Sequence, residues 1–187
     1  MMRKFWLAAA ALVVASSFGF QALAAEEHDH DHGDVEALKH GVCVLAPASG
    51  SKVQGKLTLV QHEGSLHLTG EVSGLTPGLH GFHIHEFGDL SSADGTAAGP
   101  HFNPEGHEHS GPENAKRHAG DLGNIKADDK GVAKVDVKVE GLHLHFVLGR
   151  SLVVHANPDD LKSQPAGNAG PRIGVGVIGV AKAPEAK

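Results

Sequence analysis

Residues 134–140 read Lys-Val-Asp-Val-Lys-Val-Glu, and this alternation is the clearest indication of the fold in the chain. On an extended strand the three valines would face one side and the charged residues would face the other. Such a period of two is typical of a half-buried strand in an antiparallel sheet. The stretch therefore predicts β structure with one apolar and one solvated face.

Short segments of the same kind, separated by glycine and polar turn residues, occur on both sides of this stretch. They predict an antiparallel all-β domain, a sandwich or a barrel, over residues 38–187. We expect strands at 39–45, 55–62, 65–72, 81–86, 132–140 and 151–156, with two more at 143–148 and 174–181. Two stretches break the pattern, 87–124 and 157–171, and loops of such length in a compact domain are usually functional.

The N-terminal part of the chain differs in composition from the rest. Residues 1–24 contain Arg3 and Lys4, an apolar run and then Ala22-Leu23-Ala24, which is the pattern of a cleaved signal peptide. Residues 25–37 alternate histidine with carboxylates and have no apolar period, so we expect a disordered tail. This tail either captures metal ions loosely or is a solvated acidic run with no specific role. The expected location is therefore periplasmic or secreted.

The composition excludes several classes of protein. The chain has one cysteine, Cys43, so it cannot be a disulfide scaffold. A net charge of −6 argues against a nucleic-acid or anionic-membrane binder. No apolar run after the leader approaches the ~18 residues that a membrane-spanning helix needs. The conspicuous excess is in histidine, with 16 residues, and without a thiol cluster this excess points to metal binding.

His83 and His85 lie two residues apart in an expected strand, so both imidazoles would face one side within reach of a single ion. Such a pair alone is more often structural or at the surface. The long loops, however, contain or adjoin four more imidazoles and a carboxylate, at His101, His109, His118, Asp121 and His155. Neutral imidazoles with one carboxylate and no thiolate form a ligand set that suits zinc and copper.

These residues stand in motifs that resemble the copper,zinc superoxide dismutase family. The motifs are Gly78-Leu79-His80-Gly81-Phe82-His83-Ile84-His85-Glu86-Phe87-Gly88-Asp89, Gly99-Pro100-His101-Phe102-Asn103-Pro104, Arg117-His118-Ala119-Gly120-Asp121-Leu122-Gly123-Asn124, Leu152-Val153-Val154-His155, Gly167-Asn168-Ala169-Gly170 and Gly176-Val177-Ile178-Gly179-Val180-Ala181. The resemblance covers nearly all of residues 39–182. It implies an eight-stranded Greek-key β-barrel, an immunoglobulin-like sandwich with two long functional loops. The motifs are similar to those of eukaryotic members, whereas the leader is of bacterial type.

The resemblance implies an enzyme that converts superoxide to dioxygen and hydrogen peroxide with one copper and one zinc ion per subunit. The implied copper ligands are His83, His85, His101 and His155. The implied zinc ligands are His101, as a bridging imidazolate, with His109, His118 and Asp121. Arg172 would hold the anion beside copper, His101 would carry a proton, and Asp159 would link a copper histidine to a zinc histidine. The resemblance further implies a homodimer, with a monomer as the alternative because the family's disulfide is missing, and we expect no nucleic-acid or membrane partner.

Most members of this family carry a disulfide, and its positions here fall at about Gly95 and Val175, neither of which is cysteine. Cys43 matches a free cysteine of the family and is expected to be a small buried apolar residue. Two other functions stay open. A non-enzymatic copper or zinc binding or delivery protein would not need Arg172, and a silent relative that serves as an interaction module would not need an intact ligand set.

The remaining histidines have other interpretations. His80 matches a structural position of the family. His107 could compete with His109 for zinc, although the family register favours His109. His143 and His145 alternate on an expected strand and are interpreted as a solvent-facing pair. Surface or packing roles are expected for His40, His62 and His67.

Overall fold

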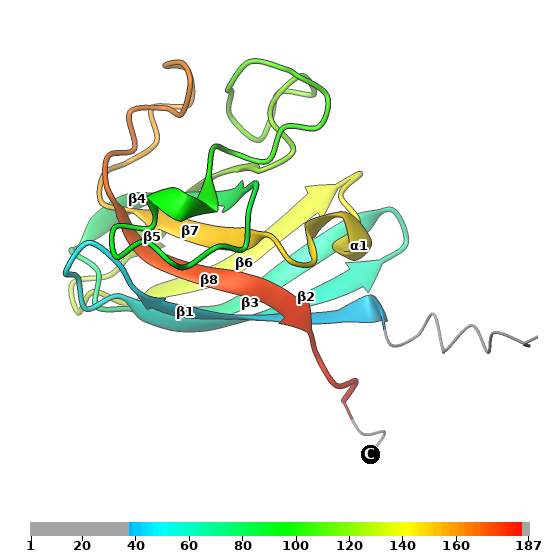
Figure 1. The fold of residues 1–187 in the computed structure, drawn as a ribbon, viewed down its shortest axis with the longest axis horizontal. Helices are drawn as coiled ribbons and strands as arrows, with labels where there is room; N and C mark the ends of the chain where they lie inside the picture. Colours follow the sequence, from blue (N-terminus) through cyan, green and yellow to red (C-terminus); the bar gives the residue numbers. More distant parts are fainter. Residues whose placement is uncertain (1–37, 185–187) are drawn as a thin grey trace, which may run out of the picture. The chain divides into compact units, whose positions relative to one another are not determined.

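Eight antiparallel strands close into a barrel in the computed structural model, which describes residues 38–184 (Figure 1). The strands are β1 (His40–Pro47), β2 (Gln54–His62), β3 (Ser65–Ser73), β4 (Gly78–His85), β5 (Asp121–Ala127), β6 (Ala133–Glu140), β7 (Ser151–His155) and β8 (Arg172–Val180). Their order around the barrel is β1-β2-β3-β6-β5-β4-β7-β8. This is the Greek-key arrangement, so the expected fold class is confirmed. The predictions for residues 1–24 and 25–37 lie outside the described residues.

The alternation that predicted the sheet is visible in β6. Val135 and Val139 are buried in the barrel core, whereas Lys134 and Asp136 are exposed. Inward-facing residues of all eight strands complete this core, among them Phe82, Ile84, Leu57, Leu59, Leu66, Leu68, Ile125, Leu152 and Ile178. Within residues 38–184, no helix is long and apolar enough to cross a membrane.

The strand expected at 143–148 is wrong, because this segment forms a short helix, α1 (Leu144–Val147). Leu144 and Val147, three residues apart, share a helical face and are both buried, so the apolar residues also satisfy a helical period. The Gln61 side chain accepts a hydrogen bond from the Leu144 N–H at 2.7 Å and so satisfies a free donor of the first turn. His145 is exposed on this helix rather than on a strand.

The prediction of one continuous loop over 87–124 is also wrong at its end, because β5 begins at Asp121. Gly123, with φ 79°, and the polar residue Asn124 give this segment the composition of a turn. Its main chain nevertheless pairs with β4, and the register places Asp121 opposite His83. The short helix η2 (Thr96–Ala98) lies in the remaining loop. The pairing brings a carboxylate beside the histidine strand.

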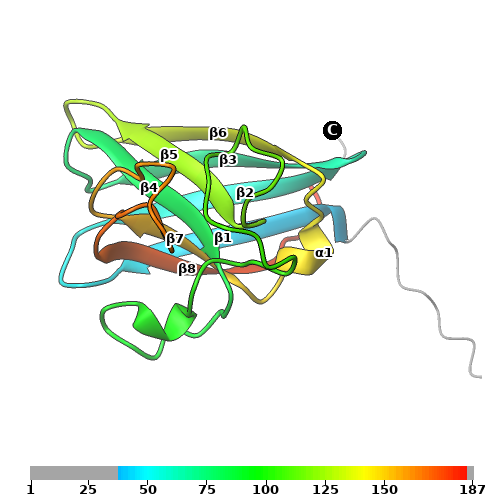
Figure 2. The same cartoon turned by 90° about the horizontal axis from the view of Figure 1, so that it is seen from above.

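The histidine strand β4 lies between β5 and β7 and has two buried faces. Phe82 and Ile84 belong to the barrel core. His83 and His85 alternate with them and therefore face the opposite side, where both are buried. Figure 1 shows parts of both long loops, green and orange, projecting on this side of the barrel, and Figure 2 shows the orange loop above β4 and β7. The loops thus cover the outer face of the strand.

The two positions of the missing disulfide lie next to each other without a covalent bond. A Cβ on Gly95 would lie 2.8 Å from Cγ2 of Val175, so the valine side chain fills the space. The loop that contains Gly95 is held to the barrel by hydrogen bonds instead, one from the Ser49 N–H to the Ala93 carbonyl oxygen at 2.9 Å.

Cys43 is fully buried, and burial raises the pKa of its thiol to about 12 against the opposing hydrogen bond of Leu152.

We therefore expect thiol reductants to leave the melting temperature unchanged. The described residues contain no disulfide that a reductant could break, and the buried, protonated Cys43 is unreactive. Differential scanning calorimetry with and without dithiothreitol checks this expectation. A shift that depends on reductant would reveal an intermolecular bridge through Cys43 and would contradict the prediction.

Candidate metal centre

Two groups of buried side chains meet under the long loops, and in each group the potential ligand atoms lie within 4.8 Å of one another. The first group, here the four-histidine cluster, consists of His83, His85, His101 and His155. The second, here the aspartate cluster, consists of His101, His109, His118 and Asp121. His101 belongs to both, so its ring lies between the two groups. The structure thus brings together every residue that the sequence analysis assigned to a metal.

Pairing between strands positions the four-histidine cluster. β4 and β7 are antiparallel, with His83 opposite Val153, so His155, two residues after Val153, faces the same side of the sheet as His83 and His85. His101 follows η2 and forms an isolated bridge with His85. This places its ring 4.0 Å from that of His83, between centroids.

Hydrogen bonds hold one nitrogen of each ring and leave the other directed into the four-histidine cluster. Nδ1 of His85 pairs with the Gly99 carbonyl oxygen at 2.8 Å, and Nδ1 of His155 pairs with that of Gly170 at 3.0 Å. Their Nε2 atoms lie only 3.3 Å apart. His83 has the opposite arrangement, with Nε2 held by Asp159 and Nδ1 buried without a partner. Unpartnered imidazole lone pairs that converge in this way fit a copper ion.

The aspartate cluster also contains buried ring nitrogens without hydrogen-bond partners. Nδ1 of His109 and of His118 lie 3.0 and 3.2 Å from Oδ1 of Asp121, yet neither atom has a hydrogen-bond partner. His101 pairs with the same oxygen through Nδ1 at 2.7 Å, and its Nε2 is buried without a partner. Three imidazoles around one buried carboxylate are a donor set that fits zinc.

Main-chain groups orient the Asp121 carboxylate. Its Oδ2 accepts hydrogen bonds from the N–H of His118 at 3.0 Å and of Ser110 at 3.1 Å. Oδ1 is therefore left for the histidines. Burial raises the pKa of Asp121, but the hydrogen bonds from His101 and Ser110 and the nearby His109 ring outweigh it and hold this pKa well below its usual range.

Asp159 connects the two clusters through hydrogen bonds to a ring of each. Its Oδ2 pairs with Nε2 of His83 at 2.8 Å, and its Oδ1 pairs with Nε2 of His109 at 3.0 Å. Asn124 in turn holds the main chain of Asp159, with distances of 2.7 and 2.9 Å. Such outer partners fix the tautomer and the orientation of ligand rings. The sequence analysis named Asp159 in this role but missed Asn124.

Arg172 begins β8 opposite His155 and faces the same hollow as the four-histidine cluster. Its Nη1 and Nη2 donate hydrogen bonds to the carbonyl oxygens of Gly95 and Gly99, each at 2.6 Å. The hollow has a volume of about 690 Å³ and is also lined by His85, His155, Pro165 and Ala166. The structure thus places a guanidinium cation at the approach to the cluster.

Burial keeps three rings of the four-histidine cluster, those of His83, His85 and His155, neutral in the metal-free chain. Burial lowers the pKa of His83 to about 4, against the hydrogen bond that its ring donates to Asp159, and that of His155 to about 3. The pKa of His85 is also well below its usual value, for the same reason. Burial likewise lowers the pKa of His109, but Asp121 and Asp159 outweigh it and raise this pKa to about 9. In the metal-free chain a protonated His109 thus supplies the positive charge between the carboxylates of Asp121 and Asp159.

We expect the metal-free protein to be most stable near pH 6.5, the ordinary histidine pKa. His83 and His155 bind protons less readily in the folded chain than in the unfolded chain, so stability falls as the pH drops from about 6.5 toward 4. His109 has a raised pKa, so its contribution to the stability of the folded chain is lost as the pH rises from about 6.5 to 9. Melting temperatures in chelator at about pH 5, 6.5 and 8.5 test this profile. A maximum at the lowest or highest pH would contradict it.

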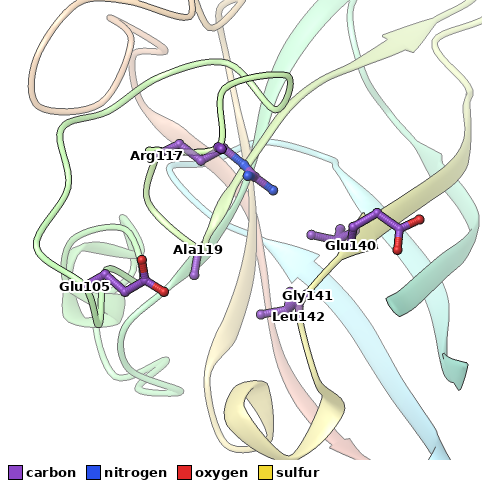
Figure 3. Close-up of a pocket in the computed structure, with 8 residues that line it drawn as sticks. Glu105, Arg117, Ala119, Glu140, Gly141 and Leu142 are labelled. Atoms are coloured by element: carbon purple, nitrogen blue, oxygen red, sulfur yellow. The ribbon is translucent and has the colours of Figure 1, made fainter. Parts of the chain in front are cut away.

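Other histidines lie outside both clusters. Both ring nitrogens of His80 pair with main-chain carbonyl oxygens, those of His155 at 2.8 Å and Thr76 at 2.9 Å. His107 is half-buried, and its Nδ1 pairs with the Arg117 carbonyl oxygen at 3.2 Å. A separate hollow of about 160 Å³, in which Figure 3 shows Arg117 between Glu105 and Glu140, contains no cluster residue.

Two further residues at the site were missed by the sequence analysis. Gly167, with φ 65°, packs directly against Asp159 and His109, and a Cβ there would lie 2.7 Å from His109 Nε2. Gln164 hydrogen-bonds the main chain of His109. Gly167 stood within a family motif, whereas nothing in the local sequence singled out Gln164.

A closed β-barrel with two adjoining histidine-rich sites that share one imidazole defines a binuclear metalloprotein. The family model for copper/zinc superoxide dismutase matches residues 53–178, and the chain belongs to this family. It is 47% identical over 164 residues to copper-zinc superoxide dismutase 3 of Arabidopsis thaliana, covering 82% of this chain and 99% of the relative. It is 45% identical over 150 residues to copper-zinc superoxide dismutase 2 of Brassica juncea, covering 75% and 97%. The protein is accordingly a copper- and zinc-dependent enzyme of superoxide dismutation.

Proposed function

We propose that the four-histidine cluster binds the copper ion of this enzyme and that the aspartate cluster binds its zinc ion. The observation that carries this assignment is the set of buried nitrogens without partners, which includes Nδ1 of His83, Nε2 of His101, and Nδ1 of His109 and His118. Buried polar atoms are normally satisfied, so nitrogens that converge without partners are explained by a bound cation. The imidazole-only set suits copper, and the set with a carboxylate suits zinc.

When bound, copper supplies the one-electron redox chemistry that dismutation needs, and zinc supplies a fixed, redox-inert charge. Arg172 attracts superoxide into the hollow and holds it beside the four-histidine cluster, because a guanidinium is permanently charged. His101 holds and releases a proton at Nε2, since its Nδ1 is committed to Asp121. Asp121 and Asp159 keep the rings oriented during this transfer. A storage or delivery protein would have no need of Arg172.

Metal analysis with a superoxide assay on the purified chain tests this assignment. We expect one copper and one zinc ion per chain, loss of activity on chelation, and recovery only when copper is restored. Recovery with zinc alone would contradict the assignment, because zinc does not change its oxidation state.

The leader and the tail support an exported enzyme that protects the cell envelope. This part of the proposal depends on the sequence of residues 1–24 and 25–37, including the capacity of the tail histidines to capture metal. Mass spectrometry of the chain recovered from the periplasm or medium tests it. A mature chain that begins near residue 25 is expected, and a chain that retains residues 1–24 in the cytoplasm would contradict it.

A homodimer is supported by apolar side chains exposed on adjoining segments. Val44 of β1 and Val180 of β8 are 63% and 56% exposed, and these strands pair with each other. Phe87 and Phe146 are 52% and 54% exposed, and the carbonyl oxygens of both residues accept hydrogen bonds from the segment that leads into β7. Exposed apolar side chains on paired strands and on segments that share hydrogen bonds support an interface here. Analytical ultracentrifugation should show a dimer, and a monomer at micromolar concentration would contradict this part of the proposal.

A further inference from the structure

Gln164 in the second long loop holds the main chain of His109 on both of its polar groups. The Oε1 atom accepts a hydrogen bond from the His109 N–H at 2.8 Å, and the Nε2 atom donates one to the His109 carbonyl oxygen at 2.8 Å. The amide thus uses one acceptor and one donor on a single residue, which fixes both the position and the orientation of that residue. The two residues are 55 positions apart in the chain, so this clamp joins the two long loops.

The same loop also encloses the side chain of His109. Asp159 binds its Nε2, and Gly167 lies so close that a Cβ would be 2.7 Å from that atom. The loop is closed on itself by hydrogen bonds from the Gly167 N–H to Ser163 at 2.7 Å and from the Asp160 N–H to Gly167 at 2.9 Å. The ring of His109 is therefore held by the carboxylate, and its main chain is held by Gln164.

The residues that follow Gln164 reach the other cluster. Pro165 and Ala166 line the hollow of about 690 Å³ together with His85, His155 and Arg172. Gln164 thus stands between the wall of this hollow and a member of the aspartate cluster. A displacement of this residue would move both.

We propose that Gln164 is a positioning residue that keeps the zinc site assembled and holds the wall of the hollow, at Pro165 and Ala166, against this site. This inference rests on the zinc assignment proposed above. A site that is assembled for only part of the time has a correspondingly lower apparent affinity, so loss of the clamp weakens metal binding without removing a ligand. Partners outside a ligand set typically change metal affinity by about 10–100-fold.

Zinc release from the full-length protein tests the proposal. We expect Gln164→Ala to transfer Zn²⁺ to a chromophoric chelator about 10-fold faster than the parent chain. Gln164→Glu keeps the acceptor for the His109 N–H but loses the donor, so an intermediate rate is expected. Ser163→Ala is the matched control, because the Ser163 hydroxyl bonds only to Asp160 within the loop, and its rate should stay within about twofold.

Substitution of Co²⁺ in the zinc site provides a readout that a merely structural role would not change. We expect Gln164→Ala to alter the visible absorption bands of bound Co²⁺, because His109 is reoriented, and Ser163→Ala to leave them as in the parent. If Gln164→Ala lowers the melting temperature but leaves zinc release and the cobalt spectrum unchanged, the proposal is overturned. Failure of the zinc assignment gives a different result. In that case either the parent chain would bind no zinc, or a His118→Ala variant would bind zinc as well as the parent chain does.

Discussion

His101→Ala is expected to reduce superoxide dismutation by more than about 100-fold, since even partners outside a metal's ligand set change activity by about 10–100-fold. His101 is the one residue that belongs to both clusters, so its loss removes a ligand from each proposed metal site. It also removes Nε2, the atom proposed to hold the proton. We expect reduced zinc content as well, measured by plasma emission spectrometry beside the superoxide assay.

His107→Ala is the control for this prediction. His107 lies in the same loop but outside both clusters, so activity and zinc content should stay within about twofold. Far-UV circular dichroism of both metal-free variants separates loss of a ligand from loss of the barrel. The assignment fails if a folded His101→Ala chain retains zinc and activity, or if His107→Ala loses them.

Gly167→Ala is expected to weaken zinc binding by at least about 10-fold and to lower activity with it. A Cβ at this position would overlap Oδ1 of Asp159 and lie 2.7 Å from His109 Nε2. Both side chains are buried and hydrogen-bonded to each other, so neither can yield without disturbing the link between the clusters. Zinc titration against a competing chelator measures the affinity, and calorimetry gives the accompanying change in melting temperature.

Gly141→Ala separates the steric effect from backbone strain. Gly141 has a similar φ of 74°, but a Cβ there would meet no atom within 4 Å. Its replacement should therefore lower the melting temperature through the strain of a positive φ, which costs about 1 kcal/mol, and leave zinc affinity unchanged. Equal zinc affinity in the two variants would show that the close packing of Gly167 is not needed.

Local sequence predicted most of the barrel because burial on one face leaves a period of two, as in β6. It failed at α1, where Leu144, Phe146 and Leu148 alternate as on a strand while Leu144 and Val147 share a helical face, and packing against the barrel decides between them. It also failed at the start of β5, because Asp121 and Asn124 serve the site and give the strand the composition of a loop. In both cases the deciding contacts are distant in sequence.

The proposed ligands were found from the sequence because all but His109 lie in family motifs, and His109 was assigned by its register between those motifs. The spacing of His83 and His85 also follows directly from strand geometry. Gln164 could not be found in this way, because its amide bonds to the main chain of His109, whose position depends on the packing of two loops. Interactions with a distant main chain leave no signature in the identity of the partner residue.

The carbonyl oxygen of Gly99 accepts hydrogen bonds from both His85 and Arg172, at 2.8 and 2.6 Å. A single peptide plane therefore sets the spacing between a ring proposed to bind copper and the cation proposed to capture the anion. Thermal motion of this loop would carry both groups in the same direction, so the distance between metal and substrate would vary less than either position alone. This one carbonyl oxygen therefore fixes the position of Arg172 relative to His85.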